Sequence, residues 1–97
     1  MAAYKGIDVS RYQGKIDWKQ VAADGVTFAI LQAGYGREIS QKDPTFETNY
    51  AGAKAAGIKV GAYWYSYADT VSRAKQEAAA FLKAIEGKEF DLPLFFD

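Results

Sequence analysis

The sequence predicts an α/β fold with a parallel sheet, and three observations support this prediction. Four short runs are apolar almost throughout, as expected of strands that are buried on both faces. Segments with apolar residues at helical spacing separate these runs. A glycine follows each helical segment at an equivalent place. The predicted order is therefore strand, helix, strand, helix, strand, helix, strand.

The first strand, the first helix and the second strand have clear local signals. Ile7–Val9 is a short β-prone core near the start of the chain. Asp17 is placed to cap the helix that follows, and Gln20 stands three residues later, as in a capping box. Gly25 allows the left-handed conformation that ends a helix. Residues 26–36 then form an apolar run of strand length.

The second helix and the third strand follow the same pattern. Asp43 is the expected N-cap of this helix, and Pro44 is the expected first helical residue. Gly57 is placed to end it. Residues 58–67, with the sequence IKVGAYWYSY, are predicted to form the third strand.

The last helix is predicted to begin at a cap on Asp69 or Thr70 and to end at Gly87. Residues 90–97 are predicted to form the fourth strand. The apolar stripe expected on one face of this helix comprises Val71, Ala74, Ala78, Phe81, Leu82 and Ile85.

Two architectures share this order of elements. One is a small doubly wound sheet, and the other is a (β/α)₈-type barrel, whose usual length is about 250 residues. Four strands in 97 residues amount to about half of such a barrel. In both architectures the functional residues are expected at the C-terminal ends of the strands.

The composition limits the chemistry available to this single expected domain. Twelve basic residues balance 12 acidic ones, so no net charge favours nucleic acid or an anionic membrane as a partner. The chain has no cysteine and no histidine, which excludes a disulfide framework, thiolate chemistry and a Ser-His-Asp triad within it. We expect no metal and no cofactor. Any acid–base chemistry must come from carboxylates, tyrosines or lysines.

Carboxylates and aromatic residues gather at the predicted strand ends. Asp8 and Asp97 each stand at or near the end of a strand. The aromatic residues in the same regions are Tyr12, Tyr35, Tyr63, Trp64, Tyr65 and Tyr67. Carbohydrate cleavage uses a pair of carboxyl groups, and flat rings stack on the apolar faces of sugars. The structural alternative is that each aspartate caps a turn and that the aromatic run is a packed strand.

Several longer segments resemble the glycoside hydrolase family 25, the Chalaropsis-type lysozymes found among phage endolysins and bacterial autolysins. The segments are GIDVSRYQGKIDWKQV, FAILQAGYG, DPTFETNYAGAKAAGIKVGAYWYSYA, AKQEAAAFL and LPLFFD, and together they extend over nearly the whole chain. The resemblance implies hydrolysis of the β-1,4 bond between N-acetylmuramic acid and N-acetylglucosamine in peptidoglycan. It also implies an irregular barrel of about twice this length, of which residues 1–97 would be the N-terminal half.

The resemblance assigns roles to individual residues. Asp8 matches the aspartate at the end of the family's first strand, and Asp97 matches the aspartate of an Asp-x-Glu motif at the end of the fourth. The glutamate of that motif is the family's general acid, and its position would lie two residues beyond Asp97. Tyr35, Tyr63 and Trp64 are the expected substrate-binding residues, although many family members have histidine where Trp64 stands.

We therefore expect a half barrel with four parallel strands and three helices that is inactive by itself. A non-catalytic module that binds peptidoglycan and an engineered half barrel made for assembly remain the alternatives. Unpaired strand edges predict a homodimer or pairing with a complementary fragment.

The expected site of action is the bacterial cell wall. The N-terminus lacks the features of a signal peptide, and no apolar stretch approaches the roughly 20 residues of a membrane span. We therefore expect a cytoplasmic location until lysis or another route of export releases the protein.

Overall fold

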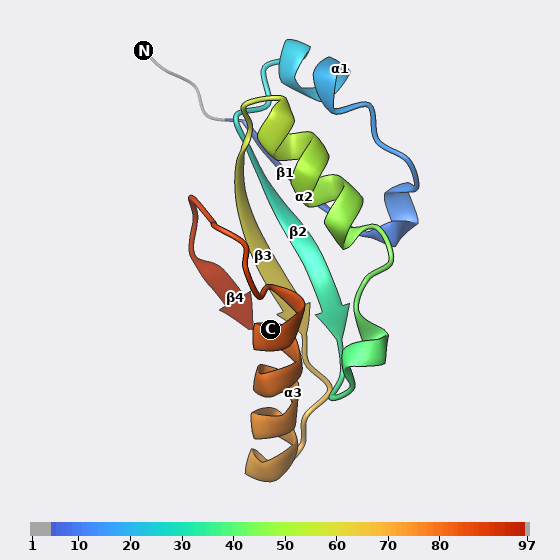
Figure 1. The fold of residues 1–97 in the computed structure, drawn as a ribbon, viewed down its shortest axis with the longest axis vertical. Coiled ribbons are helices and arrows are strands. Elements are labelled where there is room, and N and C mark those ends of the chain that lie inside the picture. Colours follow the sequence, from blue (N-terminus) through green and yellow to red (C-terminus); the bar gives the residue numbers. More distant parts are fainter. Residues whose placement is uncertain (1–4, 97) are drawn as a thin grey trace.

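The computed structural model describes residues 5–96, and its elements follow the predicted order. Figure 1 shows them along the chain. The strands are β1 (Gly6–Val9), β2 (Phe28–Tyr35), β3 (Lys59–Tyr65) and β4 (Leu94–Phe96). The helices are α1 (Trp18–Ala23), α2 (Phe46–Ala55) and α3 (Val71–Ala84), with 3₁₀ turns η1 (Arg11–Gln13) and η2 (Ile39–Gln41).

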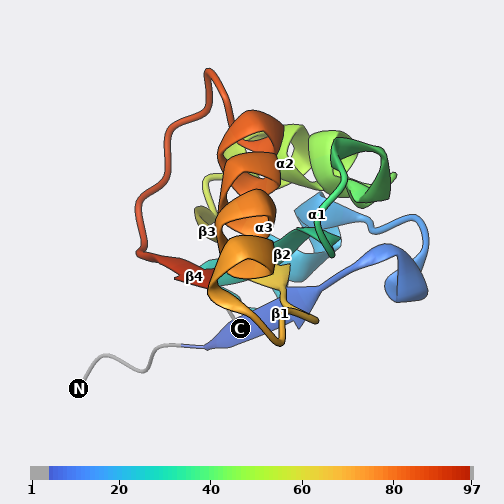
Figure 2. The same ribbon diagram turned by 90° about the horizontal axis from the view of Figure 1, so that it is seen from below.

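The four strands form one parallel sheet in the order β1-β2-β3-β4, which confirms the predicted fold class. The helices α2 and α3 lie on the same side of this sheet (Figure 2). α2 packs on β2 and β3, and α3 packs on β2. Within residues 5–96 the opposite face of the sheet carries no helix, and this face, which a closed barrel would turn inward, is called the open face below.

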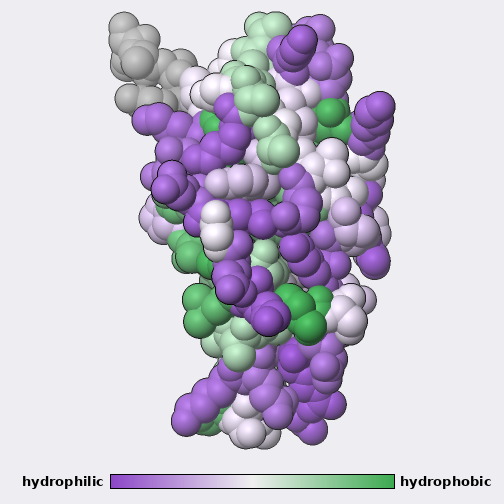
Figure 3. Space-filling view, in the orientation of Figure 1, coloured by the Kyte–Doolittle hydropathy of each residue, from purple (hydrophilic) through white to green (hydrophobic). Residues whose placement is uncertain are grey.

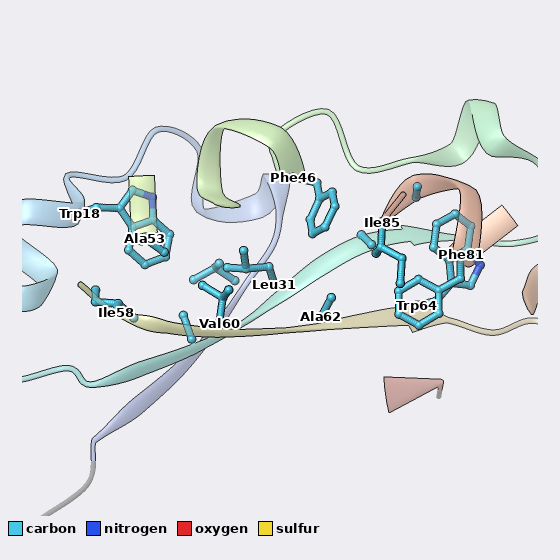
Figure 4. Close-up of a cluster of buried hydrophobic side chains, with 14 of the residues drawn as sticks. Trp18, Leu31, Phe46, Ala53, Ile58, Val60, Ala62, Trp64, Phe81 and Ile85 are labelled. Atoms are coloured by element: carbon cyan, nitrogen blue, oxygen red, sulfur yellow. The ribbon is translucent and has the colours of Figure 1, made fainter. Parts of the chain in front are cut away.

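Alternation along the strands decides which side chains form the core. In β3, Val60, Ala62 and Trp64 are fully buried toward the helices. Figure 4 shows them packed with side chains from α2 and α3. Tyr63 and Tyr65, the alternate residues of the strand, point to the open face, where Tyr63 is partly buried and Tyr65 is exposed. The strands β1, β2 and β3 therefore each contribute one set of residues to the core and another to the open face.

The helix boundaries match the prediction at two of the three N-caps. Asp17 accepts a hydrogen bond from the Gln20 amide (3.2 Å), and Thr70 caps α3. The second helix differs, because α2 begins at Phe46 with Thr45 as its N-cap. Asp43 instead lies two residues before that cap, where its carboxylate binds Thr45.

The buried face of α3 also differs from the predicted stripe. Val71 and Leu82 are exposed, whereas Phe81 packs on Trp64 with 5.7 Å between ring centroids. Glu77 is buried, because its carboxylate accepts hydrogen bonds from the loop that follows β3. The buried residues of this helix are Glu77, Ala80, Phe81 and Ala84.

Hydrogen bonds fix the segment that connects α3 to β4. Asp91 accepts from the backbone amide of Val60 (3.1 Å) and forms an ion pair with Lys54 (3.3 Å). The hydrogen bond from the Val60 amide lowers the pKa of Asp91 most, and the contact with Lys54 lowers it further. The Tyr50 hydroxyl donates to the Glu89 carbonyl (3.1 Å) and so ties the same segment to α2.

The sheet has exposed edges and exposed apolar residues around β4. Within residues 5–96, β1 and β4 each pair with a strand on one side only. Leu94, Phe95 and Phe96 are each more than two-fifths exposed. Figure 3 shows hydrophobic residues reaching the surface in the region of β4, among mostly hydrophilic neighbours.

Candidate active site

The C-terminal ends of the strands carry two clefts on the open face. The first cleft, of about 500 Å³, is lined by Ser10, Arg11, Tyr12, Gln32, Tyr35, Asp43, Tyr63, Tyr65 and Tyr67. The second cleft, of about 570 Å³, is lined by Asp8, Ile30, Tyr63, Tyr65, Phe95 and Phe96. Tyr63 and Tyr65 belong to both, so the clefts are contiguous and together form the candidate site.

Asp8 reaches the second cleft because of its place in β1. Ile7 and Val9, on either side of it, pack against the core, so alternation directs Asp8 to the open face. Asp8 is paired with Ile30 of β2, whose own neighbour in β3 is Gly61. The carboxylate is exposed and stands beside an apolar floor.

A bulge in β2 brings Tyr35 to the first cleft. Gln32 pairs with Tyr63, but the next pair in the register is Gly34 with Trp64. Ala33 is thus an extra residue, and it reverses the alternation for the residues that follow. Tyr35 consequently pairs with Tyr65 and lies on the same face as Gln32. Without the bulge, Tyr35 would point to the helices.

Tyrosine rings form the wall of the first cleft. Tyr67 contacts Tyr35 edge-on, with 6.1 Å between centroids, and contacts Tyr65 at 5.0 Å. The Tyr63 hydroxyl donates to Oε1 of Gln32 (3.4 Å) at the floor. Such a site suits a sugar, because the apolar ring faces pack on the apolar face of the sugar and the polar atoms bind its hydroxyl groups.

Two buried carboxylates hold the loops that carry these rings. Asp43 accepts from the backbone amides of Arg11 (2.9 Å) and Thr45 (2.8 Å), which links the loop after β1 to the start of α2. Glu77 accepts from the Ser66 hydroxyl (2.5 Å) and the Tyr67 amide (2.9 Å), which fixes the loop after β3. Both side chains act on the site through other residues.

The structure contradicts the placement of Trp64 in the substrate groove. Trp64 has no exposed surface, stacks on Phe81, and donates from Nε1 to the Gly36 carbonyl (2.6 Å). Tyr63 and Trp64 are consecutive residues of one strand, so they face opposite sides of the sheet. Trp64 is a core residue, and Tyr65 lines the groove next to Tyr63.

Three of the other predicted site residues line the clefts, and the fourth is not described by the structure. Tyr35, Tyr63 and Asp8 lie in the two connected clefts, whereas Asp97 lies outside the described residues. Among residues 5–96 there is no group of three or more potential metal ligands. In the same part of the chain, no helix is long and apolar enough to cross a membrane.

Arg11 and Gln32 lie in the strand-end regions expected to carry function but had no predicted role, and Asp43 was not predicted to line a cleft. Arg11 stands two residues after the first strand, so its position near a strand end was the available signal. Gln32 is a polar residue inside an apolar strand, which was a second signal. Asp43 had no such signal, because an aspartate before a helix is explained by a role as its N-cap.

Parallel strands alternating with helices, with a carboxylate and aromatic rings at the strand ends, are the arrangement expected of a barrel-type glycoside hydrolase. The chain belongs to glycosyl hydrolases family 25, whose sequence profile matches residues 7–97. It is 34% identical over 93 residues to the autolytic lysozyme of Clostridium acetobutylicum. This alignment covers 96% of this chain and 27% of that enzyme.

Solved structures agree with this assignment. A family 25 glycosyl hydrolase from Bacillus anthracis superposes with a TM-score of 0.86 at 29% identity, over 98% of this chain and 42% of that one. The modular autolysin LytC of Streptococcus pneumoniae was solved in complex with a synthetic peptidoglycan ligand. It superposes with a TM-score of 0.85 at 28% identity, over 95% of this chain and 22% of that one. The chain spans 20–34% of the length of the curated relatives it matches.

Proposed function

We propose that this chain supplies the peptidoglycan-binding groove and two carboxylates of a muramidase. The observation that carries the proposal is the position of Asp8 beside two connected clefts walled by tyrosines, at the C-terminal ends of parallel strands. The reaction is hydrolysis of the β-1,4 bond between N-acetylmuramic acid and N-acetylglucosamine. The ligand bound to the LytC autolysin supports peptidoglycan as the substrate class.

The proposed roles follow from the charges that develop during glycoside cleavage. The transition state resembles an oxocarbenium ion, so a carboxylate beside it lowers its free energy. We assign this role to Asp8 and Asp97, and we assign the holding of the sugar rings to Tyr35 and Tyr63. In the family pattern the acid that protonates the leaving oxygen stands two positions after Asp97, which is outside this 97-residue sequence.

The proposal predicts binding without turnover by the 97-residue chain. A general acid typically contributes about 10²- to 10⁴-fold to the rate, so a polypeptide of residues 1–97 alone should hydrolyse little. The chain should co-sediment with purified cell walls while the release of reducing ends stays at background. Absence of sedimentation with walls contradicts the proposed groove. Release of reducing ends that disappears in Asp8→Asn contradicts the inactivity while it supports the assignment of Asp8.

We further propose that the chain associates with a second copy of itself or with a complementary fragment. The unpaired edges of β1 and β4 and the exposed Leu94, Phe95 and Phe96 support this proposal. Sedimentation equilibrium at micromolar concentration should give a mass above that of one chain. Phe95→Lys should shift the mass toward the monomer, and Leu82→Lys, on the exposed side of α3, is the control. A wild-type chain that stays monomeric and melts cooperatively would overturn self-association.

A further inference from the structure

The loop after β1 presents a largely exposed ring on a backbone that is held in place. Tyr12 is 81% exposed, yet its amide donates to the Ser10 hydroxyl (3.2 Å). Gln13 Oε1 accepts from the Ser10 amide (2.6 Å), which completes a capping box around the turn. The Asp43 carboxylate holds the Arg11 amide from the other side. A fixed loop that exposes an aromatic ring loses little conformational entropy when a ligand binds.

Arg11 places a positive charge against this ring. Its guanidinium carbon lies 5.3 Å from the centroid of Tyr12 and 6.0 Å from that of Tyr35. Among residues 5–96, Arg11 forms no ion pair with a carboxylate. Arg11 is also the one cationic residue among the described residues that line the two clefts.

The nearby carboxylate of Asp43 does not serve as the partner of this cation. Asp43 is 5% exposed, and its oxygens already accept from the Arg11 amide, the Thr45 amide and the Thr45 hydroxyl. The contact with Tyr12 is the largest influence that raises the pKa of Arg11, and the charge of Asp43 contributes least. The guanidinium therefore remains available to an anion that enters the first cleft.

We propose that Arg11 and Tyr12 form a subsite for a sugar residue that carries a carboxylate. This proposal rests on the proposed function, since it places one part of the glycan in the first cleft. The Tyr12 ring covers the apolar face of the sugar, and the guanidinium of Arg11 pairs with the carboxylate. In peptidoglycan such a carboxylate comes from the lactyl group of N-acetylmuramic acid or from its stem peptide, and the chemistry of recognition is shared.

The test compares the dissociation constants of three soluble tetrasaccharides by calorimetry at low ionic strength. The first is a peptidoglycan glycan without stem peptides, whose lactyl carboxylates are free. The second is the same glycan with its stem peptides, and the third is chitotetraose, which has no carboxylate. The wild-type chain should bind at least one carboxylate-bearing glycan about fivefold more tightly than chitotetraose. If the first glycan binds more tightly than chitotetraose, the lactyl carboxylate is the group that Arg11 recognises. If only the second glycan does so, a carboxylate of the stem peptide is that group.

Arg11→Gln should remove the preference for the carboxylate, because it lowers the affinity for the carboxylate-bearing glycans more than the affinity for chitotetraose. The substitution keeps the backbone amide that Asp43 holds, and the side chain is exposed, so the fold should be unaffected. Lys19→Gln, which removes an exposed cation from α1, is the matched control and should keep the preference. Tyr12→Ala should weaken the binding of all three glycans about threefold or more.

Two outcomes overturn the subsite. The first is a wild-type chain that binds the three glycans equally, and the second is an Arg11→Gln variant that keeps the wild-type preference. Both leave the proposed function intact. If the wild-type chain binds none of the three glycans, the proposed function and the subsite fail together.

Discussion

Trp64→Ala should destabilise the fold by about 3–5 kcal/mol, as expected when a fully buried aromatic side chain is removed from a core. Trp64 is fully buried, stacks on Phe81, and is bound through Nε1 to the Gly36 carbonyl. The loss is a large part of the 5–15 kcal/mol that holds a typical domain together. Urea denaturation followed by circular dichroism measures it.

Tyr65→Ala is the control for this prediction, because Tyr65 is the next residue of the same strand and is 44% exposed on the open face. It should cost about 1 kcal/mol. Trp64→Phe keeps most of the core volume and should bind cell walls as the wild type does. Equal stability of the wild type and Trp64→Ala would contradict the core position. Loss of wall binding by a fully stable Trp64→Phe would return Trp64 to the substrate groove.

Tyr63→Ala should weaken the binding of a soluble peptidoglycan glycan about tenfold. Tyr63 is the central ring of the site, because it lines both clefts and its hydroxyl contacts Gln32. Removal of a central aromatic residue from a binding surface typically costs 1–2 kcal/mol or more, and about 1.4 kcal/mol corresponds to a factor of ten. Calorimetric titration of the chain with the glycan measures the change.

Tyr63→Phe separates the ring from the hydroxyl and should retain most of the affinity. Each variant is first checked for a wild-type melting temperature, so that a loss of affinity reports on the groove. Unchanged affinity in a folded Tyr63→Ala variant would place the glycan elsewhere on the molecule. Stronger loss in Tyr63→Phe than in Tyr63→Ala would contradict the stacking role of the ring.

The order and the direction of the strands could be predicted because they depend on local signals. Apolar runs of strand length alternate with helices that end at glycines, and Gly25, Gly57 and Gly87 all adopt the positive φ that the sequence predicted. Asp8 was predicted at the rim because it stands near the end of the first strand and matches the family motif. Its direction follows from alternation in the structure, because Ile7 and Val9 pack against the core.

The same alternation separates Tyr63 from Trp64, but the sequence gives no sign of which of the two faces the core. All three residues of the YWY run are aromatic, so the pattern gave no contrast between the faces of the strand. The register also required the bulge at Ala33, which directs Tyr35 to the cleft. A bulge depends on the pairing of two strands, and the sequence of β2 alone does not reveal it.

The buried carboxylates could not be predicted, because their partners lie far along the chain. Asp43 bonds to Arg11, 32 residues before it, and this contact forms only when β1 and β2 lie side by side. Glu77 lies on the buried face of α3, but a charged side chain is expected in solvent unless it has a partner. Its partners, the Ser66 hydroxyl and the Tyr67 amide, belong to the loop after β3. Long-range hydrogen bonds of this kind become visible only in the folded chain.

A ¹⁵N nuclear magnetic resonance titration of the chain with a soluble glycan of alternating N-acetylglucosamine and N-acetylmuramic acid tests the proposed groove most directly. We predict saturable shifts of the backbone amides of Asp8, Tyr35, Tyr63 and Tyr65, at the C-terminal ends of the strands. The amides of the exposed sides of α2 and α3 should remain unchanged. Shifts confined to those helices, or no shifts at saturating glycan, would contradict a peptidoglycan-binding groove on the open face.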